Sequence, residues 1–279
     1  MTAKRTISLS QVILYAVVYL FTALWLVPIA TAIITSVRTS NDIMTRGFLA
    51  FPNTLSLQSY AAAWQRGGLA HYLPNSFIIT VPSLIATLFL SSLSAYALSR
   101  FRFPGDRIIL FIYVAGMMLP FQILLLPVFR LTDALHIYNT YWAVIVFHTA
   151  FQLGFCTFVL RNYMRTIPGE LLEAARMDGC GEFRIYSQIV MPLTLPALAA
   201  VATLEFTWIF NDFLWALILI QNDALKPVTT GLAALQGQYR MDWTVIISGS
   251  LLAALPTVIV FLLLQRYFVA GLTLGATKG

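Results

Sequence analysis

Long stretches of the sequence contain no charged side chain, and short polar segments separate them. Asp, Glu, Lys and Arg are absent from residues 6–37, 67–99, 108–129, 134–160, 185–204 and 243–265. An α-helix rises about 1.5 Å per residue, so roughly 20 residues cross the hydrocarbon core of a membrane. The pattern therefore predicts one all-α membrane domain over 1–279, with six spanning helices near residues 11–34, 74–99, 108–130, 139–161, 193–221 and 244–265.

The composition supports a membrane protein. Hydrophobic residues make up 59% of the 279 residues and charged residues 10%, whereas a soluble domain has roughly 45–50% and about 25%. Too few charged side chains remain to cover a water-facing surface. The net charge of +6 is assigned to basic residues held at the cytoplasmic face of the membrane, and not to nucleic-acid binding. The two cysteines, Cys156 and Cys180, provide no disulfide framework and no metal site.

The distribution of Lys and Arg predicts the orientation. With the N-terminus inside, eleven of the 17 basic residues lie on the cytoplasmic side and six on the outer side, as the positive-inside rule requires. We expect a multi-pass membrane protein with both termini in the cytoplasm. It would have an outer loop over 38–73, an inner loop over 162–192 and a cytoplasmic tail over 266–279. The first apolar stretch is too long for a signal peptide, so we expect an uncleaved helix.

The inner loop 162–192 has the pattern of two short helices joined by a turn. Pro168 suits the first turn of a helix, and Asp178-Gly179 suits a glycine-capped helix end. A second short helix is predicted over 182–190, ended by Pro192. Periodicity alone does not separate a docking element from a solvated connector.

The spacing within this loop carries a family resemblance. Glu173-Ala174-Ala175 is followed by Gly179, then by Ile189 and Pro192. This pattern resembles the EAA loop of ABC importer permeases, in which the loop forms coupling helices that dock into a cleft of a cytoplasmic ATPase. Met191 replaces the usual leucine at similar volume. The resemblance implies a set of ATPase-coupling residues, namely Glu173, Ala174, Ala175, Asp178, Gly179, Ile189 and Pro192.

Other stretches resemble the carbohydrate-importer branch, which is related to the inner-membrane permease of the maltose system. They are Asn75-Ser76, residues 95–105, Leu119-Pro120, residues 211–215 and residues 265–279. The resemblance implies a permease subunit of a bacterial inner membrane that forms half of the translocation pathway for a sugar. The implied partners are a second homologous permease, two copies of the ATPase and an extracytoplasmic solute-binding protein. The sequence has no phosphate-binding loop and no catalytic constellation, so we expect no enzyme activity in this chain. ATP and Mg would bind to the partner ATPase.

The predicted fifth span contains two carboxylates. Glu205, Trp208, Asp212 and Trp215 recur at helical spacing and would share one face of a continuous helix. An ionised acid at bilayer depth costs about 2.5–3.5 kcal/mol and is expected to face protein or a watery cavity. Carboxylates beside aromatic rings suit a sugar, which predicts a translocation path lined by Glu205, Trp208, Asn211, Asp212 and Trp215. Helix packing at a subunit interface is the alternative, and loop or packing roles are expected for His71, His136 and His148.

The tail is predicted to adopt an extended conformation. Gly271, Gly275 and Gly279 are spaced by four residues, with Leu272 and Leu274 between them. In the maltose-type branch the corresponding tail reaches between the two ATPase subunits. The resemblance therefore implies an ATPase-contacting set of Gly271, Gly275, Lys278 and Gly279, and a frayed terminus is the alternative.

A second class of function fits the intramembrane acids. Glu205 or Asp212 could be the proton or ion site of a secondary transporter or a channel. Uptake would then depend on the ion gradient instead of ATP. The EAA-like loop favours the ABC permease.

Overall fold

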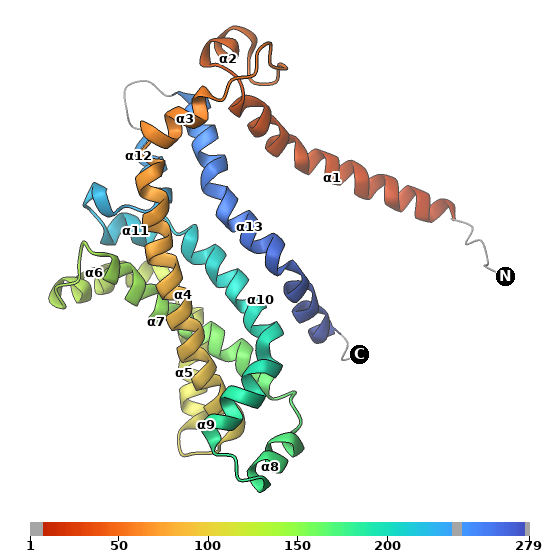
Figure 1. Ribbon diagram of the computed structural model, residues 1–279, viewed down its shortest axis with the longest axis vertical. Coiled ribbons are helices and arrows are strands. Elements are labelled where there is room, and N and C mark those ends of the chain that lie inside the picture. The colour runs from red at the N-terminus through yellow and green to blue at the C-terminus, as the bar shows by residue number, and fades with distance from the viewer. Residues whose placement is uncertain (1–7, 236–241, 277–279) are drawn as a thin grey trace. The chain divides into compact units, whose positions relative to one another are not determined.

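The computed structural model describes residues 8–235 and 242–276, with side chains for 8–234 and 242–267, and this part of the chain is helical without a β-strand. Five helices are long and apolar enough to span a membrane (Figure 1). They are α1 (Leu9–Ser36), α4 (Leu69–Arg100), α7 (Tyr141–Met164), the helix Glu182–Phe210, and Trp243–Tyr267 within α13 (Trp243–Ala276). The bent pair Asp106–Met118 and Phe121–Ala134 makes a sixth span if it is counted as one. The predicted all-α membrane fold is confirmed.

The described chain divides into two compact units. The first unit consists of Met1–Leu69 and Ala234–Leu252, and the second consists of Ala70–Ala233 and Ala253–Gly279. The second unit contains most of the spanning helices and all of the residues that form the candidate site. Each unit is considered by itself below.

In the first unit, the predicted outer loop contains two short helices, α2 (Ser40–Arg46) and α3 (Gln58–Gln65). The fully buried guanidinium of Arg38 organises this loop. It donates hydrogen bonds to Asp42 Oδ2 at 2.6 Å and to the Gly47 carbonyl at 2.8 Å. The hydrogen bond from Arg38 stabilises the charged carboxylate and so holds the pKa of Asp42 below its ordinary value.

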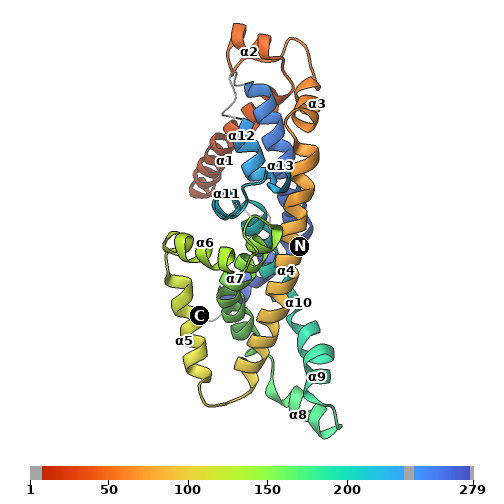
Figure 2. The same ribbon diagram turned by 90° about the vertical axis from the view of Figure 1, so that its left-hand side faces the viewer.

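In the second unit, the third span is broken, so the predicted continuous helix 108–130 is wrong. The segment consists of α5 (Asp106–Met118), a 3-10 turn (Phe121–Leu124) and α6 (Leu125–Ala134). The two parts of this bent pair meet at 96° (Figure 2). The cause is Pro120: a residue that precedes proline avoids the helical region, and Leu119 is extended with φ −70° and ψ 127°.

The predicted fifth span, 193–221, also differs from the structure. Helix α10 (Met191–Phe210) ends early, and the chain resumes as the short helix α11 (Leu214–Leu219). The carboxylate of Asp212 lies at this break. It accepts hydrogen bonds from the backbone N–H groups of Trp215 at 3.4 Å and Ala216 at 3.0 Å. An acidic side chain that satisfies free N–H groups at the start of a helix stabilises the new helix there.

At the N-terminal end of α10, the helix that precedes it continues through Pro192. The predicted helix end at this proline is therefore wrong. A short helix α9 (Glu182–Ile185) leads into a π-helical turn, Tyr186–Val190, and then directly into α10. In a π turn each N–H bonds five residues back, which widens the helix by one residue. The wider turn makes room for the proline ring and tolerates its missing N–H.

Polar side chains fasten the connection after α11 to the start of α4 and to α7. The Asn75 amide donates to the carbonyls of Ala224 and Lys226, each at 3.0 Å, and accepts from the Tyr141 hydroxyl at 2.7 Å. The Ser76 hydroxyl accepts from the backbone N–H of Val228 at 2.9 Å. The Asn75-Ser76 pair therefore has a structural role at this end of the second unit.

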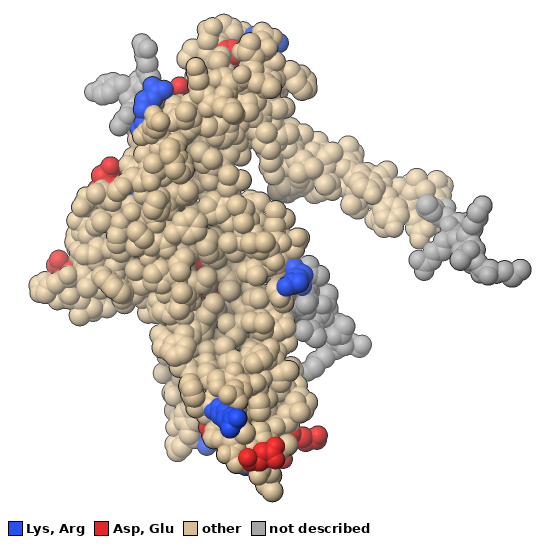
Figure 3. All heavy atoms as spheres, viewed as in Figure 1, with Lys and Arg blue, Asp and Glu red and all other residues tan. Residues whose placement is uncertain are grey.

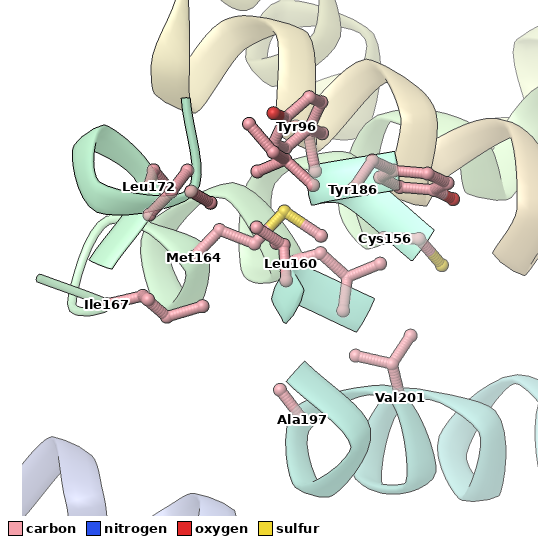
Figure 4. Close-up of a cluster of buried hydrophobic side chains, with 13 residues drawn as sticks. Tyr96, Cys156, Leu160, Met164, Ile167, Leu172, Tyr186, Ala197 and Val201 are labelled. Carbon is pink, nitrogen blue, oxygen red and sulfur yellow. The ribbon is translucent and has the colours of Figure 1, made fainter. Parts of the chain in front are cut away.

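Two buried apolar clusters hold the second unit together. One cluster joins α4, α7 and α10 to the inner loop and includes Tyr96, Leu160, Met164, Leu172 and Tyr186 (Figure 4). The other packs α7 against α11 and includes Val144, Phe147, Trp215 and Leu219. Helices α5 and α7 also pack closely against each other, and this contact depends on Gly154 of α7. A Cβ at Gly154 would lie 2.9 Å from the Tyr113 carbonyl oxygen of α5.

Substitution of Gly154 tests this packing. We expect Gly154→Ala to lower the melting temperature of the detergent-purified protein by several degrees, since overpacking against backbone costs about 1–3 kcal/mol. Gly116→Ala on α5 is the matched control, because a Cβ at Gly116 meets open space. There, alanine is expected to be neutral or to stabilise the helix. Equal melting temperatures for Gly154→Ala and the parent protein would contradict the close approach of α5 and α7.

Candidate functional site

The inner loop carries a short helix, α8 (Gly169–Met177), that ends at a glycine. Gly179 has a φ of +78°, and its N–H donates to the Arg176 carbonyl. The next N–H, of Cys180, donates to the Ala175 carbonyl. This pair of bonds is the Schellman pattern, in which glycine adopts the left-handed conformation without strain. The predicted glycine cap is confirmed, but Pro168 precedes α8 and does not lie in its first turn.

Helix α8 is attached to the C-terminal ends of α4 and α7. Its apolar face buries Leu172 and Ala175 in the cluster that also contains Met164 of α7. The guanidinium of Arg100, at the end of α4, donates to the carbonyls of Met164 and Ile167. Met164 is the last residue of α7 and Ile167 lies in the connection to α8, so these bonds tie the end of α4 to both. The loop is therefore held on the second unit at a defined position.

A chain of polar contacts adds to this attachment. The Tyr96 hydroxyl of α4 donates to the Glu182 carboxylate at 2.7 Å, and Arg176 Nε of α8 donates to the same carboxylate at 2.7 Å. The bond to Glu182 stabilises the charged guanidinium and raises the pKa of Arg176 above its ordinary value. The Tyr186 hydroxyl of the π turn shares a 2.7 Å hydrogen bond with Ser92 of α4. Movement of α8 would therefore displace both α4 and the helix that leads into α10.

The opposite face of α8 is open. Three large apolar side chains are exposed there and just after it: Leu171, Met177 and Phe183. Among the predicted coupling residues, the exposed ones are Glu173, Ala174, Asp178, Gly179 and Pro192, whereas Ala175 is buried and Ile189 is half-buried. Figure 3 shows charged side chains gathered at this end, over α8 and α9. Exposed apolar groups within a charged surface are typical of a protein-binding site.

A cavity of about 430 Å³ lies between α5, α7, α10 and α11. Its wall is mainly aromatic, with Phe121, Phe147, Phe151, Phe155, Trp208 and Trp215. Three polar side chains also line it, His148, Gln152 and Asp212, and Met117 completes the wall. A concave, mostly apolar pocket of this size with a few polar groups is typical of a small-molecule site. Within the described residues, no group of three His, Cys, Asp or Glu side chains is arranged to hold a metal ion.

The two helix breaks place side chains on the cavity wall. The bend at Pro120 brings Phe121 and Met117 to it, and the break after α10 brings Asp212 to it. The Trp215 ring stacks on Phe147, with ring centroids 3.6 Å apart, and Trp208 packs against Phe155 at 5.2 Å. The aromatic wall is thus fixed by ring contacts between α7 and the segments that follow it.

The structure separates the residues that were predicted to line a path. Trp208, Asp212 and Trp215 lie on the cavity wall. Glu205 is fully buried elsewhere, and its Oε1 accepts a hydrogen bond from the Cys156 thiol at 3.2 Å. The Asn211 amide donates to the Thr207 carbonyl at 2.8 Å and to the Thr257 hydroxyl at 3.3 Å. The prediction of one shared helical face is wrong, because α10 ends at Phe210.

The sequence analysis missed two polar residues of the wall, His148 and Gln152; His148 was expected to have a loop or packing role. Its Nε2 lies 3.6 Å from Asp212 Oδ2, and its side chain is 5% exposed. The signal in the sequence was its spacing: His148 and Gln152 are one helical turn apart and share a face. Aromatic residues at positions 147, 151 and 155 follow the same spacing.

The predicted extended tail is also wrong within the described residues. Helix α13 continues from its apolar part through Ala276. A helix that is already formed adds one hydrogen bond for each further residue, so extension costs little even across Gly271 and Gly275. The predicted contact residues Lys278 and Gly279 lie outside the described part of the chain.

Comparison with known proteins agrees with this architecture. The chain is 36% identical over 255 residues to the arabinooligosaccharides transport system permease protein AraQ of Halalkalibacterium halodurans, covering 90% of this chain and 91% of that protein. A solved chain of a bacterial ABC transporter involved in the import of the acidic polysaccharide alginate has the same fold, with a TM-score of 0.83 at 22% identity over 96% of this chain and 99% of that one.

A second solved structure, of a bacterial alginate ABC transporter in complex with its pentasaccharide-bound periplasmic protein, matches with a TM-score of 0.67 at 15% identity, over 91% of this chain and 93% of that one. Residues 87–273 match a family model described as the inner membrane component of binding-protein-dependent transport systems. That match spans more than half of the chain and includes both the cavity and the inner loop. The chain belongs to this family of membrane permeases.

Proposed function

We propose that this chain is a permease subunit of an ATP-driven sugar importer and forms half of the translocation path. The observation that carries the proposal is the aromatic cavity at the two helix breaks, with the carboxylate of Asp212 in its wall. A sugar ring can pack its C–H faces on aromatic rings while its hydroxyls donate hydrogen bonds to a carboxylate. AraQ is named as a permease of an arabinooligosaccharides transport system, which supports a sugar as the substrate of this chain as well.

The inner loop, which contains α8, links the permease to ATP hydrolysis. We assign Leu171, Met177 and Phe183, with the exposed EAA residues, to the surface that docks on a cytoplasmic ATPase. Two copies of that ATPase bind ATP and Mg, because this chain has no phosphate-binding loop of its own. In this proposal α8 and both chain termini lie in the cytoplasm, and the tail beyond Tyr267 reaches toward the ATPase.

The remaining partners complete the path. A second homologous permease supplies the other half of the pathway, and an extracytoplasmic solute-binding protein delivers the sugar. The solved alginate transporter with its bound periplasmic protein supports this arrangement. Closure of the ATPases displaces α8 and switches the cavity between outward and inward openings, as a two-state population shift.

Neutralising Asp212 tests the path. Asp212→Asn keeps one oxygen that can accept the Ala216 N–H, so the helix break should persist. Loss of a charge-assisted hydrogen bond of roughly 1.5–3 kcal/mol predicts a fall in sugar uptake of about tenfold or more. Uptake is measured in proteoliposomes with the binding protein and ATP, and the assembled complex is checked by size-exclusion chromatography.

Asp133→Asn is the matched control, because Asp133 is exposed on α6 and lies away from the cavity. It should transport at the parental rate. Full uptake by Asp212→Asn would remove Asp212 from the path. Dissociation of the complex would support the alternative role of Asp212 at a subunit interface.

The coupling turn gives a second test. Gly179→Val forces a β-branched residue into a φ of +78°, which strains the turn. Holding valine in the left-handed conformation costs about 1–2 kcal/mol, which corresponds to a roughly tenfold smaller population of the intact turn. We expect membrane insertion to survive while sugar-stimulated ATP hydrolysis and uptake both fall by about that factor.

Gly181→Val is the control in the same turn. Gly181 has an extended conformation, with φ −69° and ψ 158°, and a Cβ there meets open space. Valine tolerates this conformation, so ATP hydrolysis should stay close to the parental value. If Gly179→Val hydrolysed ATP and transported sugar as the parent does, the assignment of this turn to coupling would be wrong.

A further inference from the structure

Gln152 of α7 presents an unpaired amide to the cavity. It lines the wall, and its side chain is half-buried there. The amide makes no hydrogen bond within the described residues, although it can donate two and accept through its oxygen. The ring nitrogens of His148, the next polar residue of the wall on α7, have no accessible surface. Of the three polar side chains in the wall, Gln152 and Asp212 are therefore the ones that a ligand can reach.

The surroundings of this amide favour a ligand with hydroxyl groups. The cavity wall is mainly aromatic, and a polar group in apolar surroundings costs free energy unless it gains a hydrogen-bond partner. A hydroxyl can be that partner, because it both donates and accepts. A ligand of the same shape without the hydroxyl would leave the amide unpaired, and a site of this kind discriminates against it.

Two contacts of α7 fix the position of Gln152 in the wall. His148 Nε2 lies 3.6 Å from Asp212 Oδ2. Two turns further along α7, the Phe155 ring packs against Trp208 with ring centroids 5.2 Å apart. Residue numbers therefore rise along α7 while they fall along the facing segment, residues 208–212. Gln152 lies one helical turn from both His148 and Phe155, so it faces the stretch between Trp208 and Asp212.

Trp208 supplies an apolar surface beside this amide. It lines the cavity and is 46% exposed, so its contact with Phe155 leaves much of the indole uncovered. A sugar ring can pack its C–H face on an aromatic ring while its hydroxyls, which lie around the edge, meet polar groups at the side. A ring placed on Trp208 would direct such hydroxyls toward Gln152, the amide that faces the same stretch of the wall.

We propose that Gln152 and Trp208 form a subsite for one hydroxylated sugar ring, in which Trp208 stacks on the ring and Gln152 hydrogen-bonds to its hydroxyls. The inference rests on the proposed function and deepens it, because it assigns a selective role to the permease itself. Gln152 is the specificity-determining residue: it favours a ring that carries hydroxyls over a similar ring that carries none. Trp208 binds both kinds of ring, because stacking does not depend on the hydroxyls.

The test is ligand binding to the complete permease–ATPase complex in nanodiscs, without the binding protein and with empty nanodiscs as the blank. Saturation-transfer NMR titrations compare methyl α-D-glucopyranoside with 2-methoxytetrahydropyran, which has the same ring and methoxy group but no hydroxyl. We expect the parent complex to bind the glucoside about tenfold more tightly. Gln152→Met keeps an unbranched side chain of similar size without the amide. It should weaken binding of the glucoside about tenfold, the loss expected for one hydrogen bond, and should not weaken binding of the hydroxyl-free probe.

Two further variants make the result specific. Trp208→Leu removes the stacking ring and should weaken binding of both probes severalfold. Gln65→Met is the matched control, because Gln65 is exposed on α3 and does not line the cavity, and it should bind both probes as the parent does. Unchanged binding of the glucoside by Gln152→Met, or an equal loss for both probes, would overturn the subsite. Unchanged binding of both probes by Trp208→Leu would also count against it.

A separate measurement distinguishes this subsite from the proposed function. ATP-dependent uptake of the sugar carried by the binding protein is followed for the parental complex in proteoliposomes. If uptake is present but the parent binds neither probe, the subsite is wrong and the proposed function stands. If the parental complex shows no ATP-dependent sugar uptake, the proposed function itself fails.

Discussion

A helix that is interrupted inside a membrane exposes backbone groups that must find partners in the protein or line a wet cavity. The break after Phe210 meets this constraint through Asp212. Its carboxylate accepts two N–H groups of the next helix, and its carbonyl accepts the hydroxyl of Thr229. The other break, at Pro120, has one donor fewer to satisfy because proline lacks an N–H. Both breaks contribute residues to the cavity wall. The cavity is therefore a consequence of how two spanning helices are interrupted.

One continuous helical segment, Glu182–Phe210, joins the inner loop to this cavity. Its first residue bonds to Tyr96 of α4, and Tyr186 in its π turn bonds to Ser92. Near its other end Trp208 stands on the cavity wall. In the proposed mechanism, a displacement of α8 is passed through these contacts to the segment, and the segment moves the cavity wall. Packed helices respond to such a push by switching between discrete arrangements, which is the behaviour that alternating access needs.

The sequence was sufficient for features that depend on local chemistry. Uncharged runs located the spanning helices because charge at membrane depth is costly, and the glycine cap at Gly179 was predictable because its bonds lie within one turn. The helix breaks were not predictable in this way. Several other prolines lie inside helices without ending them, among them Pro28, Pro74, Pro82, Pro196 and Pro256. A proline alone does not fix a break, so the break at Pro120 depends on tertiary packing as well. The meeting of His148 with Asp212 depends on the packing of α7 against the second break.

The claim that the cavity is the path and changes its access with ATP can be tested by thiol labelling. Gln152→Cys is placed in a chain that carries Cys156→Ala and Cys180→Ser, so that it is the single reactive thiol. The complex is labelled with a membrane-impermeant reagent from each side of a proteoliposome, without nucleotide and after trapping with ATP and vanadate. We expect labelling from one side of the membrane in the complex without nucleotide, and from the other side in the complex trapped with ATP and vanadate. Equal labelling in both states, or protection from both sides throughout, would contradict it.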